Sequence, residues 1–571
     1  MIRPYWLSDD RWHGLGLLVV VVTLTLGMVY LSVLLNRWNN DFFSALQDKN
    51  AAAFRRQLLQ VTWLVGAFIL LAVYQLYLSQ MLEIRWRRWL TERYLLAWLA
   101  DRAYYRMQLI ARETDNPDQR IAEDIQLLVS HTLALFIGGL RAFVTLTTFV
   151  AILWSLSGQL TVPIGDHTLV LPGYMVWVSI LYALGGTWLT DWIGRPLVRL
   201  NFDKQRYEAD FRFSLVRFRE NSEGVALYRG EPDEFRGFRA LFESVVQNWW
   251  GIMRRQKRLT SFTSGYSQGA WIVPSIVAAP RYFRGELGLG GLMQTVGAFN
   301  QVQDALSFFV VSYKEIAAWC AVVERLAGFE RTLARVRRDT ARGGGVQHAD
   351  GDEQELRVEN VDLHLPDGRP LIAHVNLSLQ RGESVLLGGA SGSGKSTLFR
   401  AIAGIWPFGR GEIRTSSKAR VLFLPQRPYL PIGTLRSVVS YPMPADGVSD
   451  AALRDALEAV GLPELARRLD ESGHWALQLS PGEQQRIAFA RALLQKPDWL
   501  FLDEATSAVD EPTEERLYRL LHERLPGTTL FSVGHRATLR SFHSRQLTVK
   551  RTGTGPATVV EETPAPRPRT G

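Results

Sequence analysis

The stretch ESVLLGGASGSGKSTLFRAIAGI, residues 383–405, decides the fold of the second half of the chain. It runs from an apolar strand through a glycine-rich loop into an apolar helix. Residues 389–396 match the pattern G-x-x-x-x-G-K-[ST] in the strand–loop–helix context that the pattern requires. Backbone N–H groups of such a loop cradle phosphate groups. The stretch therefore predicts an α/β domain that binds a nucleotide.

The loop supplies most of the predicted nucleotide contacts. Lys395 is expected to meet the β- and γ-phosphates, and the Ser396 hydroxyl to ligate Mg²⁺. The residues predicted to surround the phosphates are Gly389, Ala390, Ser391, Gly392, Ser393, Gly394, Lys395, Ser396 and Thr397. The alternative, a chance match in a glycine-rich chain, is disfavoured by the correct flanking strand and helix.

Two further strands carry candidate catalytic groups. DWLFLDEATSAVD, residues 498–510, is an apolar strand that ends in Asp503 and Glu504. Asp503 is placed for the Mg²⁺ shell, and Glu504 for the general base that polarises a water. TTLFSVGHR, residues 528–536, ends in His535, a candidate γ-phosphate contact. Each feature alone is more often structural, but together with the phosphate loop they indicate an ATP-hydrolysing site.

The segment LSPGEQQR, residues 479–486, reads as the start of a capped helix. Ser480 is a good N-cap, Pro481 fits the first helical position, and Glu483 completes a capping box. Gly482 keeps the helix end free of a side chain, and helix N-termini attract anions. On these residues alone, an ordinary capped helix is the favoured interpretation.

Taken together, these segments resemble the nucleotide-binding domain of ABC transporters, whose signature LSGGQ precedes the acidic strand. In that family the signature contacts the γ-phosphate of ATP held by a partner domain. The resemblance implies this contact for Ser480 and Gly482. It also implies that Gln426 of FLPQRPYL contacts ATP and Mg²⁺, and that Asp510 of SAVD belongs to the ATP site.

Three residues depart from the family pattern. Pro481 replaces the first signature glycine and Glu483 replaces the glutamine, but neither removes Ser480 or the Gly482 N–H, so the contact is expected to survive. Leu365 occupies the position of the usual adenine-stacking aromatic residue. Base recognition is therefore expected to rest on apolar packing and to be less selective among nucleotides.

The first half of the chain is dominated by long apolar runs. Six runs are long enough to cross a hydrocarbon core about 30 Å thick: residues 14–35, 61–82, 142–160, 169–190, 259–280 and 287–313, the last interrupted by Asp304. The net charge of +9 accompanies arginines that flank these runs. Contact with lipid headgroups explains that charge better than nucleic acid does, and no nucleic-acid partner is expected.

The distribution of basic residues predicts the orientation in the membrane. Residues 83–124 and 191–258 carry 8 and 14 Lys/Arg, against 4, 0 and 2 in the three opposite connections. The positive-inside rule therefore places both long segments in the cytoplasm, where helices are expected to continue past the bilayer. The ATPase domain is expected on the same side of a multi-pass cell-membrane protein.

The predicted organisation has four parts. Residues 1–340 form a helical membrane domain with six transmembrane helices, and 341–355 form a glycine-rich linker. Residues 356–551 form the α/β nucleotide-binding domain, and 552–571 a disordered tail. The segments at 36–47, 208–231 and 298–326 resemble the bacterial SbmA/BacA-related transporters fused to an ATPase domain, with peroxisomal fatty-acyl transporters as distant relatives. That resemblance implies an exporter-like fold and a homodimer with two equivalent ATP sites.

The sixth apolar run carries the candidate cargo contacts. Gln294, Gln301, Asp304 and Ser307 fall within about one helical face, at steps of seven, three and three residues. An acid is costly against lipid, so this face is expected to line a watery cavity. The alternative is hydrogen bonding between helices of the bundle.

A polar cavity favours hydrophilic cargo such as peptides or cobalamin-like compounds, and the resemblance to the bacterial transporters implies import. Export of the same or amphipathic cargo, and transport of fatty acyl-CoA, remain alternatives. So does an ATP-gated channel or regulator.

Overall fold

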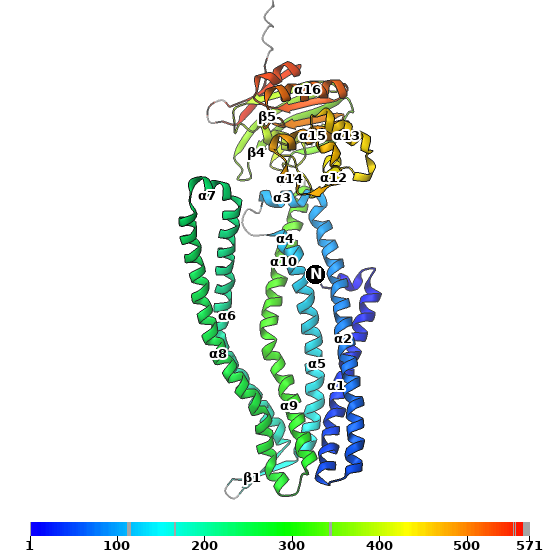
Figure 1. Ribbon diagram of the computed structural model, residues 1–571, viewed down its shortest axis with the longest axis vertical. Helices are drawn as coiled ribbons and strands as arrows, with labels where there is room; N and C mark the ends of the chain where they lie inside the picture. The colour runs from blue at the N-terminus through cyan, green and yellow to red at the C-terminus, as the bar shows by residue number, and fades with distance from the viewer. Residues whose placement is uncertain are drawn as a thin grey trace, which may run out of the picture. The chain divides into compact units, whose positions relative to one another are not determined.

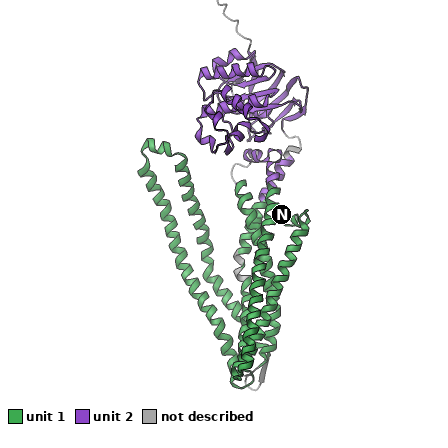
Figure 2. Cartoon of the chain, turned by 45° about the vertical axis from the view of Figure 1, so that its right-hand side comes forward, with its two compact units in different colours: residues 1–94, 117–327 green, residues 95–116, 328–571 purple. Residues whose placement is uncertain are grey.

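The computed structural model describes residues 2–110, 116–164, 167–341, 345–551, 553 and 555–562. It divides into two compact units (Figure 2). Unit 1 contains residues 1–94 and 117–327, and unit 2 contains residues 95–116 and 328–571.

Unit 1 is built mainly from long helices, with a few short ones between them (Figure 1). They are α1 (Arg11–Gln47), α2 (Ala51–Leu99), α4 (Pro117–Gln119), α5 (Ile125–Ser157), α6 (Tyr174–Glu220), α7 (Ser222–Tyr228), α8 (Glu231–Phe283), α9 (Leu289–Val311) and α10 (Tyr313–Ala341). The short helices η1 (Tyr5–Leu7) and η3 (Arg120–Asp124) and the hairpin strands β1 (Gln159–Ile164) and β2 (His167–Pro172) complete it. Helix α2 leaves unit 1 after Tyr94, and α10 leaves it after Ala327.

Three helical stretches in the described residues are long and apolar enough to cross a membrane. They are Arg11–Gln47, Ala51–Leu109 and Pro117–Ser157. The other three predicted spans fall on α6, α8 and α9, which do not meet the same criterion of length and composition. Helices α2, α6 and α8 do continue far beyond the apolar runs at 61–82, 169–190 and 259–280, as the sequence predicted.

Helix α9 occupies the centre of the packing in unit 1. It contacts α1, α5, α6 and α8. A buried cluster that includes Val33, Phe149, Tyr174 and Phe299 joins four of these helices. Many other large apolar side chains of unit 1, such as Trp63, are exposed, as expected for helices solvated by lipid.

Unit 2 contains a ten-stranded sheet with the order β3-β7-β4-β5-β14-β13-β6-β12-β11-β8. Its strands are β3 (Gln347–Asp350), β4 (Glu355–His364), β5 (Pro370–Gln380), β6 (Ser384–Gly389), β7 (Gly409–Thr415), β8 (Val421–Leu424), β11 (Trp499–Asp503), β12 (Thr529–Val533), β13 (Arg545–Arg551) and β14 (Ala557–Glu562). The run β13-β6-β12-β11-β8 is parallel throughout. This arrangement is the expected α/β core.

Helices and a small second sheet pack around this core. They are α11 (Lys395–Ile402), α12 (Leu435–Ser440), α13 (Asp450–Ala459), α14 (Trp475–Gln478), α15 (Pro481–Gln495) and α16 (Glu511–Arg524). The small sheet pairs β9 (Gly433–Thr434) with β10 (Ser472–Gly473), and three 3-10 turns are η4 (Ala445–Gly447), η5 (Leu465–Arg467) and η6 (Ala537–Phe542).

A segment that the sequence assigned to the membrane domain packs with the nucleotide-binding unit instead. It comprises the end of α2, η2 (Ala100–Arg102) and α3 (Ala103–Ile110). The Arg102 Nη1 donates to the Ala403 carbonyl over 2.7 Å, and Leu109 packs against the apolar core of the sheet. Residues 328–341 of α10 also belong to this unit. The predicted division at residue 340 therefore did not describe the compact units.

Two predicted irregular segments contain strands. Within the predicted linker, β3 pairs in parallel with β7. Within the predicted disordered tail, β14 pairs with β13 and begins beside β5. The prediction was wrong for these residues because pairing with distant strands compensates for weak local signals. Residues 342–344, 552, 554 and 563–571 of the two segments lie outside the described residues.

We predict that β14 stabilises unit 2. Deletion of residues 552–571 should remove the β13–β14 ladder, the buried Ala557 and the 2.7 Å ion pair between Arg545 and Glu561. The free energy of unfolding should fall by about 2–3 kcal/mol, since each lost hydrogen bond contributes roughly 0.5–1.5 kcal/mol. Thermal unfolding of the detergent-solubilised protein measures this. Deletion of residues 563–571 is the matched control, and equal melting of both variants would contradict the prediction.

Candidate ATP-binding site

The order of the parallel strands brings the predicted site residues to one edge of the sheet. Strand β12 lies between β6 and β11. The loops that follow these three strands carry the phosphate loop, His535, and the pair Asp503 and Glu504. Because carboxyl ends of parallel strands meet at the same edge, groups up to 150 residues apart in the chain become neighbours.

The phosphate loop has the conformation and the donors that a polyphosphate requires. Gly389 has φ +136°, and a Cβ there would lie 2.8 Å from the Val549 carbonyl oxygen, so only glycine fits. Helix α11 begins at Lys395, whose Nζ donates to the Gly389 and Ala390 carbonyls over 2.9 Å each. The Ser393 Oγ is buried without a hydrogen-bond partner among the described residues. This cationic cradle with an unpaired hydroxyl fits the phosphates of ATP.

The predicted Mg²⁺ residues also gather at this edge. The Ser396 Oγ donates to Asp503 Oδ1 over 3.2 Å, and the Gln426 Nε2 donates to Glu504 Oε2 over 2.9 Å. Burial raises the pKa of the Asp503 carboxyl above its ordinary value, and the charge of Glu504 adds to this effect. Hydroxyl, carboxylate and amide oxygens are the donors that Mg²⁺ prefers, so Ser396, Asp503 and Gln426 fit the ion.

Glu504 is held in an unusual backbone conformation. Its φ is +48°, in the left-handed region that non-glycine residues rarely adopt, and its N–H donates to the Val533 carbonyl over 3.0 Å. Such conformations cluster at functional sites, where the surrounding structure imposes them. The strained turn directs the carboxylate away from β11 and toward Gln426.

His535 and Asp510 lie on two loops that are joined to each other. The Arg536 Nη1, next to the exposed His535, donates to the Val509 carbonyl over 2.9 Å and lies 3.5 Å from the buried Glu514 carboxylate. Asp510 is the N-cap residue of α16. The loop after β12 and the loop after β11 are therefore positioned together.

Ser480 and Gly482 lie at the start of α15, where the structure confirms the capping box with proline at the first helical position. A Cβ on Gly482 would lie 3.0 Å from the Ala508 carbonyl oxygen, so this glycine permits close approach to the loop after β11. In the part of the chain that the structure describes, the Ser480 side chain bonds with Glu483 and with no residue of the phosphate loop.

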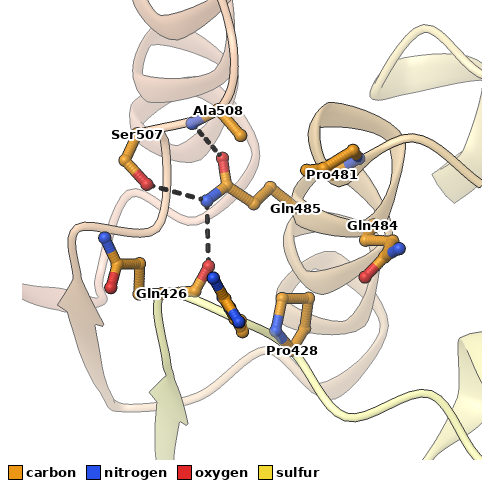
Figure 3. Close-up of a pocket in the computed structure, with 8 residues that line it drawn as sticks. Gln426, Pro428, Pro481, Gln484, Gln485, Ser507 and Ala508 are labelled. Atoms are coloured by element: carbon orange, nitrogen blue, oxygen red, sulfur yellow. Dashed lines mark hydrogen bonds between the residues drawn. The ribbon is translucent and has the colours of Figure 1, made fainter. Parts of the chain in front are cut away.

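Gln485 is a site residue that the sequence did not reveal (Figure 3). It is 3 % exposed, and its Nε2 donates to the Gln426 carbonyl over 2.9 Å and to the Ser507 Oγ over 3.1 Å. Its Oε1 accepts from the Ala508 N–H over 2.9 Å. These bonds tie α15 to the loops after β8 and β11. No local pattern distinguishes Gln485 from its neighbour Gln484, because its function depends on tertiary contacts.

These residues surround a pocket of about 420 Å³ (Figure 3). It is lined by Gln426, Arg427, Pro428, Pro481, Gln484, Gln485, Ser507 and Ala508. The pocket therefore lies where three segments meet: the loop after β8 that carries Gln426, the helix α15 that begins after Ser480, and the loop after β11.

Leu365 lies on a tight turn beside the sheet. Its N–H donates to the Arg369 carbonyl over 2.9 Å, and its carbonyl accepts from the Gly368 N–H over 2.9 Å. The half-buried side chain packs against the apolar cluster of the sheet. A nucleotide base at this position would therefore contact an aliphatic side chain and would not stack on an aromatic ring.

In unit 1, two of the four predicted cargo residues gather around a tyrosine. The Tyr266 hydroxyl on α8 donates to the Tyr182 carbonyl on α6 over 3.2 Å, and the side chains of Gln303, Asp304 and Ser307 on α9 lie close enough to act on it electrostatically. The Tyr182 ring on α6 stacks on Tyr266 at 4.5 Å between centroids. Tyr182, Tyr266 and the buried Gln303 were not predicted from the sequence.

The remaining two predicted cargo residues are not in this group. The Gln294 carbonyl accepts from the Asn36 Nδ2 on α1 over 3.0 Å, so this end of α9 packs against another helix. Gln301 is half-buried on α9. This contact uses the backbone of Gln294, so the side chains of Gln294 and Gln301 stay predicted cargo contacts.

Comparison with known proteins shows the family to which this chain belongs. Residues 1–283 match the model of the ABC transporter transmembrane region 2, and residues 372–507 match the ABC transporter model. The chain belongs to the ABC transporters. With one membrane domain and one ATPase domain, it is a half-transporter, and half-transporters dimerise.

Individual relatives cover nearly the whole chain. The inner membrane ABC transporter ATP-binding protein YddA of Escherichia coli is 37% identical, covering 94% of both chains. The human lysosomal cobalamin transporter ABCD4 is 27% identical, covering 97% of this chain and 94% of its own. A bacterial Atm1-family ABC exporter with ATP bound has the same fold, with a TM-score of 0.72, 19% identity and coverage of 95% and 94%.

These findings confirm the fold class and the general activity. An exporter-like helical membrane domain is followed by an α/β ABC nucleotide-binding domain that hydrolyses ATP to drive transport. The resemblance to transporters of the YddA type is confirmed as well. The assignment of individual site residues stays a prediction supported by the distances above.

We predict that Gln485→Leu lowers the ATP turnover number about tenfold, which corresponds to about 1.4 kcal/mol. The substitution leaves the Ala508 N–H and the Gln426 carbonyl without this partner and releases both loops from α15. Steady-state ATPase measurements test this. Gln484→Leu is the matched control because its bonds reach only Ala476 and Leu479, over 2.9 Å each. An equal loss in both variants would contradict a specific function for Gln485.

We also predict weak base selectivity. The wild-type protein should hydrolyse GTP with a kcat/KM within about threefold of that for ATP, because Leu365 provides no aromatic stack. Leu365→Tyr should raise kcat/KM for ATP about three- to tenfold, as expected for a stacking energy of roughly 0.5–1.5 kcal/mol. Leu365→Met serves as the aliphatic control. Strong ATP selectivity in the wild-type protein would show that other residues read the base.

Proposed function

We propose that the chain forms a homodimeric, multi-pass transporter of a bacterial inner membrane, with its ATPase domains in the cytoplasm, that imports hydrophilic solutes. The polar group around Tyr266 on the membrane helices carries the cargo proposal. The membrane location is supported by the name of the YddA relative, and the cytoplasmic side by the basic segments 83–124 and 191–258.

The homodimer is supported by the position of the signature residues. Ser480 is exposed and bonds to its own helix, whereas the phosphate loop is at the edge formed by β6 and β11. If Ser480 and Gly482 contact a γ-phosphate, as the family resemblance implies, the phosphate is that of a second copy. Two identical copies then share two equivalent ATP sites.

Exposed apolar residues of unit 1 also fit a dimer. The short helix α7 joins α6 and α8, and its last two residues, Leu227 and Tyr228, are 78% and 90% exposed. This end of the helix pair lies in the predicted cytoplasmic segment, where lipid does not cover it. A second copy offers the cover that such residues require in a stable assembly.

Each residue of the site has its own proposed role in ATP hydrolysis. Lys395 and the loop N–H groups hold the phosphates, and Ser396, Asp503 and Gln426 would hold Mg²⁺, which would supply neutralisation of the phosphate charge. Glu504 accepts the proton of the attacking water. His535 is placed for the γ-phosphate at the same edge.

A hydrophilic cargo is supported by the polar group on α6, α8 and α9. The hydroxyl of Tyr266 lies there within electrostatic range of the Gln303 amide, the Ser307 hydroxyl and the Asp304 carboxylate. Polar groups within membrane helices are costly unless they line water or bind a partner. The 27% identical human relative is named for cobalamin, a hydrophilic cargo.

The competing functions remain distinguishable. Export of the same or amphipathic cargo uses the same site with the opposite direction, and fatty acyl-CoA presents a polar head to it. An ATP-gated channel or a regulator would hydrolyse ATP without moving a solute against its gradient.

We predict ATP-dependent loss of cargo from preloaded vesicles. The protein is reconstituted in sealed liposomes that contain labelled cobalamin or a labelled hydrophilic peptide, and ATP is added outside, where the ATPase domains of inverted molecules lie. An importer should empty these vesicles. Glu504→Gln should bind ATP, lose turnover by at least about 100-fold, and move no cargo.

Each other outcome has a definite meaning. Accumulation of cargo in empty vesicles would reverse the direction. Active ATP hydrolysis without movement of either solute would contradict the hydrophilic-cargo proposal, and acyl-CoA would be tested next. Normal hydrolysis by Glu504→Gln would contradict the assignment of Glu504 as the base.

A further inference from the structure

Glu483, in the first turn of α15, accepts hydrogen bonds from the signature serine, Ser480. Its Oε2 accepts from the Ser480 hydroxyl over 2.7 Å and from the Ser480 N–H over 2.8 Å. The Glu483 N–H points back to the Ser480 Oγ over 3.4 Å. The hydroxyl expected to contact a γ-phosphate is therefore engaged by a carboxylate of the same helix.

This carboxylate is ionised near neutral pH. The pKa of Glu483 lies below its ordinary value chiefly because the Ser480 side chain hydrogen-bonds to it. Partial burial opposes the shift, while the Ser480 N–H and the charge of Arg486 add to it. The positive end of the helix also favours an anion at this position. Arg486 itself donates to the Gly461 carbonyl over 2.8 Å, so it does not pair directly with Glu483.

The helix start has fewer free donors than a signature with two glycines. Pro481 has no N–H to offer. Of the remaining donors, the Glu483 N–H already points to the Ser480 Oγ and the Ser480 hydroxyl is engaged by Glu483, which leaves the Gly482 N–H. A γ-phosphate that arrives here competes with Glu483 for the same helix end and the same hydroxyl.

The negative charge is not needed to cap the helix. A glutamine in the third helical position also completes a capping box, because its side-chain oxygen accepts from the N-cap N–H. The hydrogen-bonded cap therefore does not depend on the charge, whereas the charge repels a phosphate, since like charges within about 4–6 Å disfavour each other.

We propose that Glu483 guards the signature: it holds Ser480 while the ATP site is open, raises the ATP concentration needed to close the shared site, and favours reopening after hydrolysis. This inference rests on the proposed homodimer in which Ser480 meets the ATP of the second copy. Glu483 is a positioning residue, because it acts through Ser480.

The test measures ATP occlusion by full-length protein in lipid nanodiscs. The Glu504→Gln protein, with and without Glu483→Gln, is titrated with labelled ATP, and the ATP retained after rapid removal of free nucleotide is counted. Glu483→Gln should lower the half-saturating ATP concentration about tenfold, equivalent to about 1.4 kcal/mol. The ratio between the half-saturating ATP concentrations of the two proteins should shrink as salt rises from about 0.05 to about 0.5 M, because screening weakens a charge effect.

Two controls separate guarding from other effects. Glu523→Gln removes the same charge from the exposed surface of α16, near its carboxyl end, and should leave the titration unchanged. The melting temperature of Glu483→Gln should equal that of the parent, since the cap is retained. In a protein that keeps Glu504, Glu483→Gln should lower KM for ATP, which a purely structural residue would not do.

The outcomes distinguish this inference from the proposal on which it rests. Occlusion with the same or a higher half-saturating concentration in Glu483→Gln would overturn the guard function and leave the shared site intact. No ATP-dependent occlusion in any variant would overturn the shared site, and the guard function with it.

Discussion

The parallel order of β6, β12 and β11 is the constraint on which the ATPase unit depends. It fixes the end of the phosphate loop beside the end of the acidic strand, so that the Ser396 hydroxyl reaches Asp503 over 3.2 Å. Gln426, which follows the next parallel strand, then reaches Glu504 over 2.9 Å. The chemistry needs hydroxyl, carboxylate and amide groups at one point, and strand order alone brings them there.

Helices transmit the state of this edge to the rest of unit 2. Helix α15 is bonded through Gln485 to two loops that end at the edge, and any shift of those loops acts on its first turn. Helix α11 begins in the phosphate loop, and its far end, at the Ala403 carbonyl, accepts a hydrogen bond from Arg102. Arg102 is the last residue of η2, which follows α2, so the phosphate loop and the end of this helical chain belong to one compact unit.

The features that the sequence predicted correctly are those set by local patterns. The phosphate loop, the acidic strand and the capping box at Ser480 each depend on residues a few positions apart, and all three formed as expected. Gln485 and the Tyr182–Tyr266 pair were missed because their partners are far apart in the chain. Strand β14 was missed for the same reason: its composition is that of a tail, and its partners supply the order.

The polar residues of α9 are linked along the chain to residues of unit 2. Helix α9 carries Asp304 and Ser307 and continues, through Ser312, into α10, which enters unit 2 after Ala327. Within unit 1, Arg325 of α10 donates to the buried Asp124 over 2.6 and 2.9 Å.

A buried carboxylate is stable only while it is paired, so this contact resists separation of α10 from the start of α5. Within unit 1, a rotation of α10 therefore acts on the start of α5 through this ion pair, and on α9, which precedes α10 directly in the chain.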